Sequence, residues 1–270
     1  PPSHWPYFNT PTMTLHRRTL LGMCAALALP VHAQVTDFND AINKAGRQRM
    51  LSQRVCKAYL ALGLQVQTTA ATKVLDQSMA LFDRQLTELK AYAPTAPIRE
   101  TYTQLESQWS ALKGLLVGAP PNAANAIKLI TQDSVVLTLA NTGTTQLEQV
   151  QGKPVGKLVN LAGRQRMLSQ RMAKFYMAQT WGVESTQASA EVAKARAEFA
   201  QALDTLRNAP EATTEIKQEL ALADAQWVLF GAAISAKPSS INADHVFSAS
   251  ENLLTVMDKV TGLYSKLQKT

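Results

Sequence analysis

The chain has 270 residues, of which 46% are hydrophobic and 6% aromatic, so it can bury the core of one large domain or of two ordinary ones. It holds only 12 glycines and 12 prolines, and its many Ala, Leu, Gln and Lys residues argue against an all-β fold. The formal net charge of +7 is compatible with a nucleic acid, a membrane surface or a small anion as the partner, and does not choose between them.

Residues 1–33 have the pattern of upstream sequence followed by a cleaved signal peptide. Met13 precedes the basic pair Arg17 and Arg18, an apolar run over 19–29 and a processing site that ends at Ala33. The run is too short to span a bilayer. We therefore expect an exported, soluble, periplasmic protein without a membrane span. The general secretion route is favoured, and the two arginines leave the twin-arginine route open.

The residues after position 33 offer little for catalysis. They contain one cysteine, Cys56, and one histidine, His245, which excludes an internal disulfide framework, a Cys/His zinc cluster and a haem attachment motif. Glu-x-x-His, the signature of metal sites in helical bundles, is absent. We therefore expect no enzymatic activity, no metal and no cofactor. Nucleic-acid binding is disfavoured because the aromatic residues are not interleaved with the basic stretches.

The chain contains one unit written twice. Residues 46–54, GRQRMLSQR, recur without change at 163–171, an offset of 117 residues. At the same offset Asn43 matches Asn160, Lys57 matches Lys174, and Phe82 matches Phe199. The duplication predicts a first unit over residues 34–150 and a second over 151–270.

Helical periodicity divides each unit into four segments. In chain order, the predicted helices cover 37–67, 69–92, 97–117 and 122–150, then 155–182, 184–208, 211–233 and 241–269. Breaks rich in proline and glycine separate them. Four helices of about 20–30 residues with short loops are typical of an up-down four-helix bundle. The predicted fold is therefore all-α, with two such bundles in tandem.

The repeated nine residues are more alike than packing requires, since bundle cores tolerate exchanges between apolar residues. Two explanations are open: a shared binding role, or a purely structural motif. On a helix, Gly46, Arg49 and Gln53 share one face, which we expect to be semi-buried, while Arg47 and Arg54 share another, where a solvated face is the alternative to a binding role. The second copy places Gly163, Arg166 and Gln170 on the first face, and Arg164 and Arg171 on the second.

The charges around both copies are one-sided. Residues 41–75 and 149–183 each contain six bases and no acid. A buried arginine needs an acceptor, because its desolvation otherwise costs several kcal/mol. Either acids on neighbouring helices or an outside anion must supply that acceptor, and the planar guanidinium suits a planar oxyanion.

Residues 45–54, AGRQRMLSQR, resemble the opening helix of the PilJ-type domain, the periplasmic N-terminal region of type IV pili methyl-accepting chemotaxis transducers. That domain is similar to the sensor domain of the NarX nitrate/nitrite kinase. The resemblance implies a four-helix bundle that pairs through its first helix, with nitrate or nitrite held at the interface by arginines from both sides. By position, the glycine and arginine of that clamp fall on Gly46 and Arg49, and again on Gly163 and Arg166.

From the resemblance we expect the first helices of the two units to pair as an internal pseudo-dimer, with Arg49 and Arg166 facing one small inorganic anion. The supporting residues would be Arg47, Gln53, Arg54, Arg164, Gln170 and Arg171. Since such transducers signal through membrane helices, the expected partner is a membrane-bound receptor or transporter component. The alternative is a helical scaffold or interaction protein of the periplasm that binds no ligand.

Overall fold

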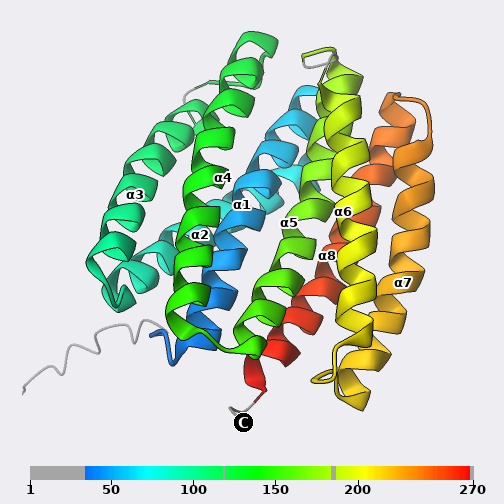
Figure 1. Ribbon diagram of the computed structural model, residues 1–270. Helices are drawn as coiled ribbons and strands as arrows, with labels where there is room; N and C mark the ends of the chain where they lie inside the picture. The colour runs from blue at the N-terminus through cyan, green and yellow to red at the C-terminus, as the bar shows by residue number, and fades with distance from the viewer. Residues whose placement is uncertain (1–33, 118, 184–186, 268–270) are drawn as a thin grey trace, which may run out of the picture. The chain divides into compact units, whose positions relative to one another are not determined.

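The computed structural model describes residues 34–117, 119–183 and 187–267, so the predicted signal peptide lies outside the described residues. In this part of the chain the regular structure is entirely α-helical, as predicted (Figure 1). The first unit contains α1 (Phe38–Gly63), α2 (Thr68–Tyr92), α3 (Ala96–Val117) and α4 (Ala123–Gln151). The second contains α5 (Pro154–Trp181), α6 (Ala188–Asn208), α7 (Thr214–Ser235) and α8 (Ser240–Lys266).

Several helices begin at residues that satisfy their free N–H groups. Asp37, Asn122 and Ser239 each precede a helix and accept a hydrogen bond from the backbone N–H three residues later. Thr213 caps α7 in the same way, so this helix begins at 214 and not at 211 as predicted. The first turn of α5 contains Pro154, whose fixed φ suits that position.

The end of α1 departs from the prediction, because the helix stops at Gly63 and not at residue 67. Gln65 takes a left-handed conformation with φ 58°, and the Val66 N–H donates to the Ala61 carbonyl at 2.9 Å. The apolar Val66 side chain is thereby buried, and hydrophobic periodicity alone could not distinguish this turn from one more turn of helix. The same turn follows α5, where Gly182 has φ 75°.

Two further predicted ends fall partly outside the described residues. The sixth helix was predicted from residue 184 and begins at Ala188, and 184–186 are not described. The eighth was predicted to 269, whereas α8 ends at Lys266 and residues 268–270 are not described. The seventh helix was predicted to end at 233 and ends at Ser235, and the remaining predicted ends agree with the structure to within one residue.

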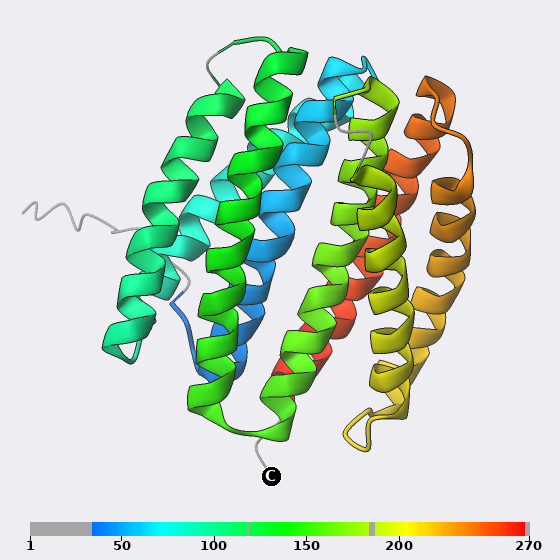
Figure 2. The same cartoon turned by 45° about the horizontal axis from the view of Figure 1, so that its top comes forward.

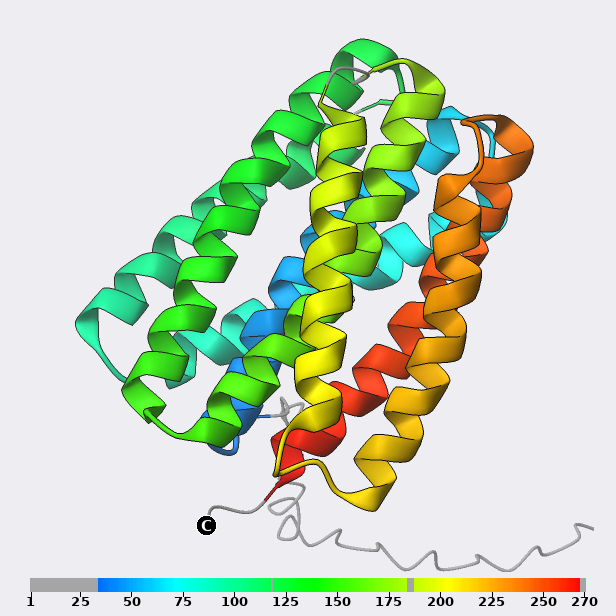
Figure 3. The ribbon, with the colours of Figure 1, turned by 45° about the vertical axis from the view of Figure 1, so that its right-hand side comes forward.

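The two units pack against each other through their first helices. α1 and α5 lie side by side and make the most extensive contact between any two helices (Figure 2). In each unit the first helix also packs on the second and fourth, and the third packs on the fourth. α3 and α7 consequently lie at opposite edges of this part of the molecule (Figure 3). The predicted pairing of the first helices is therefore present.

The core repeats along with the sequence. Phe82 stacks on Trp109 with ring centroids 3.8 Å apart, and Phe199 stacks on Trp227 at 4.3 Å. Each stack joins the second and third helices of its unit. None of the helices in the described ranges is long and apolar enough to span a membrane.

Candidate functional site

The repeated glycines face each other between α1 and α5. A Cβ added to Gly46 would lie 3.7 Å from the Cα of Gly163, and a Cβ added to Gly163 would lie 3.7 Å from the Cα of Gly46. Glycine is unfavourable inside a helix, so its use here is explained by the close approach of the other helix. The two copies of the motif are thus related as in a symmetric dimer.

Arg49 and Arg166 come together beside these glycines. The Nη2 atoms of Arg49 and Arg166 lie 3.2 and 3.5 Å from the point that a Cβ of Gly46 would occupy. Both side chains are fully buried, with 1% and 0% of their surface exposed. The sequence predicted a semi-buried Arg49, which was an underestimate because α5 covers the face that a single bundle would leave open. We call these two residues the arginine pair.

The two members of the arginine pair have different acceptors. Arg49 donates from Nη1 to Asn141 Oδ1 at 2.9 Å, and from Nη2 to Asn160 Oδ1 at 2.7 Å and to its carbonyl at 3.2 Å. Arg166 donates from Nη1 to Asp258 at 2.5 Å and from Nη2 to the Asn43 carbonyl at 2.9 Å. The Nε atoms of both arginines are buried and have no acceptor among the described residues. Each arginine therefore retains a buried N–H, that of Nε, which the described protein groups leave unused.

Burial and mutual repulsion destabilise the charged form of both arginines. Burial, together with the charges of Arg164 and Arg166, lowers the pKa of Arg49 to about 9. Burial also lowers the pKa of Arg166, although the Asp258 carboxylate opposes it, and the pKa falls to about 10. Both remain cations at neutral pH, so an anion placed beside them would be stabilised.

The four other arginines of the motif take their acids from neighbouring helices. The pairs are Arg47 with Asp258 at 2.8 Å, Arg54 with Glu251, Arg164 with Glu198 at 2.6 Å, and Arg171 with Glu191 at 2.6 Å. Arg47 and Arg54 are 20% and 18% exposed, so neighbouring side chains cover most of their surface. The acids absent from residues 41–75 and 149–183 are supplied to these arginines by α6 and α8, which periodicity could not show.

Gln53 and Gln170, expected to support anion binding, donate to protein acceptors instead of facing the arginine pair. Gln53 donates to both carboxylate oxygens of Asp133, at 2.8 and 3.0 Å, and Gln170 donates to the Ser250 carbonyl at 3.0 Å. In these contacts the two glutamines tie the first helix of each unit to its own fourth helix.

Other residues of the motif have structural roles that repeat in both units. Gln48 donates to the Phe82 carbonyl at 3.4 Å, and Gln165 donates to the Phe199 carbonyl at 2.7 Å. Ser52 and Ser169 are buried, and each hydroxyl donates to the carbonyl three residues earlier. Packing therefore accounts for part of the identity between the two copies, and the arginine pair is what packing alone does not account for.

Lys57 and Lys174 correspond at the same offset of 117 residues, but the sequence did not predict their burial or their partners. Both are fully buried, and each reaches the fourth helix of the opposite unit. Lys174 Nζ lies 2.7 Å from Asp133 Oδ2, and Lys57 Nζ lies 2.6 Å from Glu251 Oε1. Burial, opposed by the Glu251 charge, lowers the pKa of Lys57 to about 8. Their repetition at the offset of 117 was the one signal in the sequence that could have identified them.

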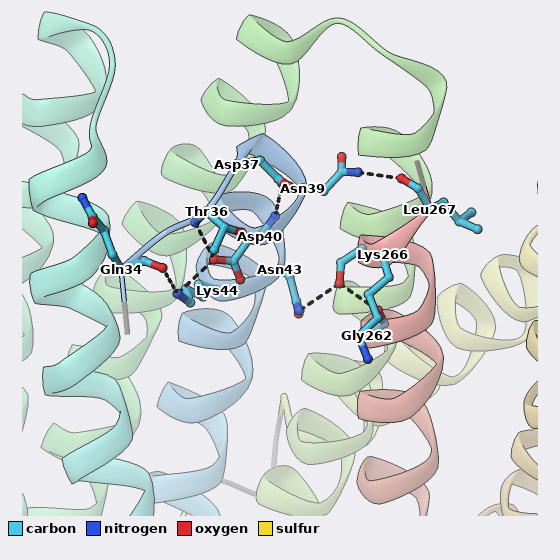
Figure 4. A pocket seen from close by; sticks show the side chains of 11 residues that line it. Gln34, Thr36, Asp37, Asn39, Asp40, Asn43, Lys44, Gly262, Lys266 and Leu267 are labelled. Atoms are coloured by element: carbon cyan, nitrogen blue, oxygen red, sulfur yellow. Dashed lines mark hydrogen bonds and ion pairs between the residues drawn. The ribbon is translucent and has the colours of Figure 1, made fainter. Parts of the chain in front are cut away.

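A cavity of about 840 Å³ lies between the start of α1 and the end of α8 (Figure 4). Its Lys44 is paired with Asp40 at 3.0 Å and with Glu88 at 2.7 Å. Figure 4 shows Lys44 also directed at the Gln34 carbonyl. Neither member of the arginine pair lines this cavity, but Asn43 does, and its carbonyl accepts from Arg166 Nη2 at 2.9 Å. Among the described residues, no three His, Cys, Asp or Glu side chains gather into a metal-binding group.

Comparison with known proteins places the chain in a family. No curated protein and no solved structure matches it. The family described as Type IV pili methyl-accepting chemotaxis transducer N-term, PilJ, matches residues 32–141 and 149–240, in agreement with two tandem copies. PilJ domains are typically periplasmic sensory domains, and the family is not enzymatic. Because the two matched segments cover most of the sequence, the chain belongs to the PilJ family.

Proposed function

We propose that this protein is an exported periplasmic sensory module that binds one small oxyanion, nitrate or nitrite first, at the arginine pair. The observation that carries the proposal is the meeting of two buried guanidinium groups beside facing glycines, each with an unused Nε donor. A planar oxyanion matches the geometry and the charge of such donors.

The same arrangement supports a sensory role. Two buried cations repel each other, and the pKa of Arg49 is lowered in part by Arg166. An anion between them would replace repulsion by attraction and favour the state in which α1 and α5 are tightly paired. A membrane-bound receptor or transporter component would then detect this state. We propose such a component as the partner, with copurification from membranes as its test.

Calorimetric titration of the protein with sodium nitrate and sodium nitrite tests the proposal, with sodium chloride as the control for ionic strength. We expect saturable heat with the two oxyanions. Arg49→Ala and Arg166→Ala should abolish this heat while the helical circular dichroism is retained. Arg49→Lys should weaken binding, because lysine keeps the charge but lacks the planar donor fork. Arg207→Ala should bind like the parent, since Arg207 is a surface residue paired with Asp204 and Asp224.

The second candidate is a periplasmic scaffold without a ligand, and the ion pair between Arg166 and Asp258 favours it. In this case internal acceptors satisfy the arginines sufficiently. The scaffold predicts no saturable heat at millimolar nitrate with the fold intact, and that result would refute anion binding. Export is tested separately by cell fractionation, and the mature protein is expected to begin at Gln34.

A further inference from the structure

Two surface grooves occupy equivalent places in the repeat. One, of about 260 Å³, lies between α4, α5 and α6, and we call it the α4 groove. The other, of about 450 Å³, lies between α1, α2 and α8, and we call it the α8 groove. Arg164 and Arg171 line the α4 groove, and Arg47 and Arg54 line the α8 groove. Arg164 corresponds to Arg47, and Arg171 to Arg54, at the offset of 117 residues. Each groove therefore combines two helices of one unit with the fourth helix of the other.

Each groove leads to one member of the arginine pair through a single side chain. Asn141 lines the α4 groove and accepts the hydrogen bond from Arg49 Nη1 at 2.9 Å. Asp258 is the corresponding residue 117 positions later, where it lines the α8 groove and accepts from Arg166 Nη1. Its side chain is 43% exposed. The two grooves thus differ in the group that accepts from the arginine, which is a neutral amide in the α4 groove and a carboxylate in the α8 groove.

That difference makes the two arginines electrostatically unequal. Burial would raise the pKa of Asp258, but the charges of Arg166 and Arg47 outweigh burial and lower the pKa to about 2, so the group is an anion at neutral pH. Among the residues that the structure describes, the acceptors of Arg49 are amide and carbonyl oxygens. The Glu148 carboxylate raises the pKa of Arg49 through its charge. It accepts a hydrogen bond from the Asn160 amide and not from the guanidinium itself.

We propose that Asp258 is a built-in anion, which supplies at Arg166 the negative charge that a free oxyanion supplies at Arg49. The oxyanion then enters through the α4 groove, on the side of Asn141, and the protein binds one anion and not two. A singly charged anion is favoured, because Asp258 already neutralises one cation and Glu191 and Glu198 line the α4 groove. This inference rests on the proposed function, since it assigns an entry side and a charge to the same site.

Exchanging the two corresponding residues tests the inference. Asp258→Asn makes the second groove like the first, and nitrate should bind about tenfold more tightly, a usual size for coupling between two ligands of one site. Asn141→Asp places a second carboxylate on Arg49, and nitrate should bind at least about tenfold more weakly. Asp204→Asn is the matched control, since Asp204 is exposed and pairs only with Arg207 at the surface.

The outcomes separate this inference from the proposed function. If the parent binds nitrate and Asn141→Asp binds it equally well, the role of Asp258 is refuted while the anion site stands. If neither the parent nor Asp258→Asn binds nitrate, the proposed function itself fails. Should Asp258→Asn not fold, Asn141→Asp still decides, because it retains Asp258 and adds a partner to Arg49. Its melting temperature should rise and should no longer respond to nitrate.

Discussion

Lys174 on α5 and Asp133 on α4 form a fully buried ion pair between the two units. Of the contacts between the units, this pair should lower the free energy of unfolding most when it is broken. The Nζ–Oδ2 distance is 2.7 Å, and both side chains are 0% exposed. Lys174→Met keeps the apolar stem and removes the charge. The Asp133 carboxylate then keeps the hydrogen bonds from the Gln53 amide but loses its ion pair with Lys174. Removing one partner of a buried pair costs about 3–5 kcal/mol. This is a large share of the roughly 5–15 kcal/mol that stabilises a folded domain.

Urea unfolding followed by far-ultraviolet circular dichroism measures this cost. The double variant with Asp133→Asn added should recover most of the loss, because it removes the stranded charge, and the cycle should give a coupling energy of at least about 2 kcal/mol. Lys113→Met is the matched control, since its pair with Asp83 is 35% and 48% exposed and should be worth less than about 1 kcal/mol. Equal losses from the variants at 174 and 113 would refute the buried pair and the docking of α5 on α4.

Three further outcomes are expected. Gly46→Ala should raise the free energy of unfolding little or not at all, because the added Cβ would lie 3.2 Å from Arg49 Nη2. Gly114→Ala, with open space around residue 114, should raise the free energy of unfolding by about 1 kcal/mol. Equal increases for the two variants in urea unfolding would contradict the close pairing of α1 and α5. Gln65→Gly should stabilise by about 1 kcal/mol, because residue 65 has φ 58°, and an unchanged urea midpoint would contradict this. Burial would raise the pKa of Glu251, but Lys57 and Arg54 lower it from 4.5 to about 2, so its contribution is present at neutral pH and lost as the pH falls from about 4.5 toward 2. Melting temperatures across this range should therefore fall less steeply for Glu251→Gln than for the parent, and parallel curves would argue against the ion pair.

The helices were largely predictable because their causes are local. Apolar residues repeat with the helical period, and capping residues such as Asp37 and Asn122 precede the helices that they begin. The end of α1 was not predictable, because Gln65 takes a left-handed conformation that usually calls for glycine. The glycine in the corresponding turn of the second unit, Gly182, was the available hint.

The candidate site was only partly predictable, for reasons of distance along the chain. Repetition of the motif indicated which residues matter, and the family resemblance predicted that Arg49 and Arg166 would meet. The acceptors could not be predicted, since Arg47 and Asp258 are 211 residues apart and share no local pattern. The burial of Lys57 and Lys174 was likewise hidden, because a lysine on a helix is most often a surface residue.

The sequence by itself thus determined the helical fold, its duplication and the concentration of positive charge on two corresponding helices, since periodicity, repetition and charge are local properties. Only the tertiary structure decided how that charge is balanced. Packing of α1 on α5 brings the arginine pair together, and the fourth helices supply Asn141 to Arg49 and Asp258 to Arg166. The physical reason is that docking brings each motif against the corresponding fourth helix, which carries an amide at 141 and a carboxylate at 258, so that identical motifs acquire unequal electrostatic surroundings.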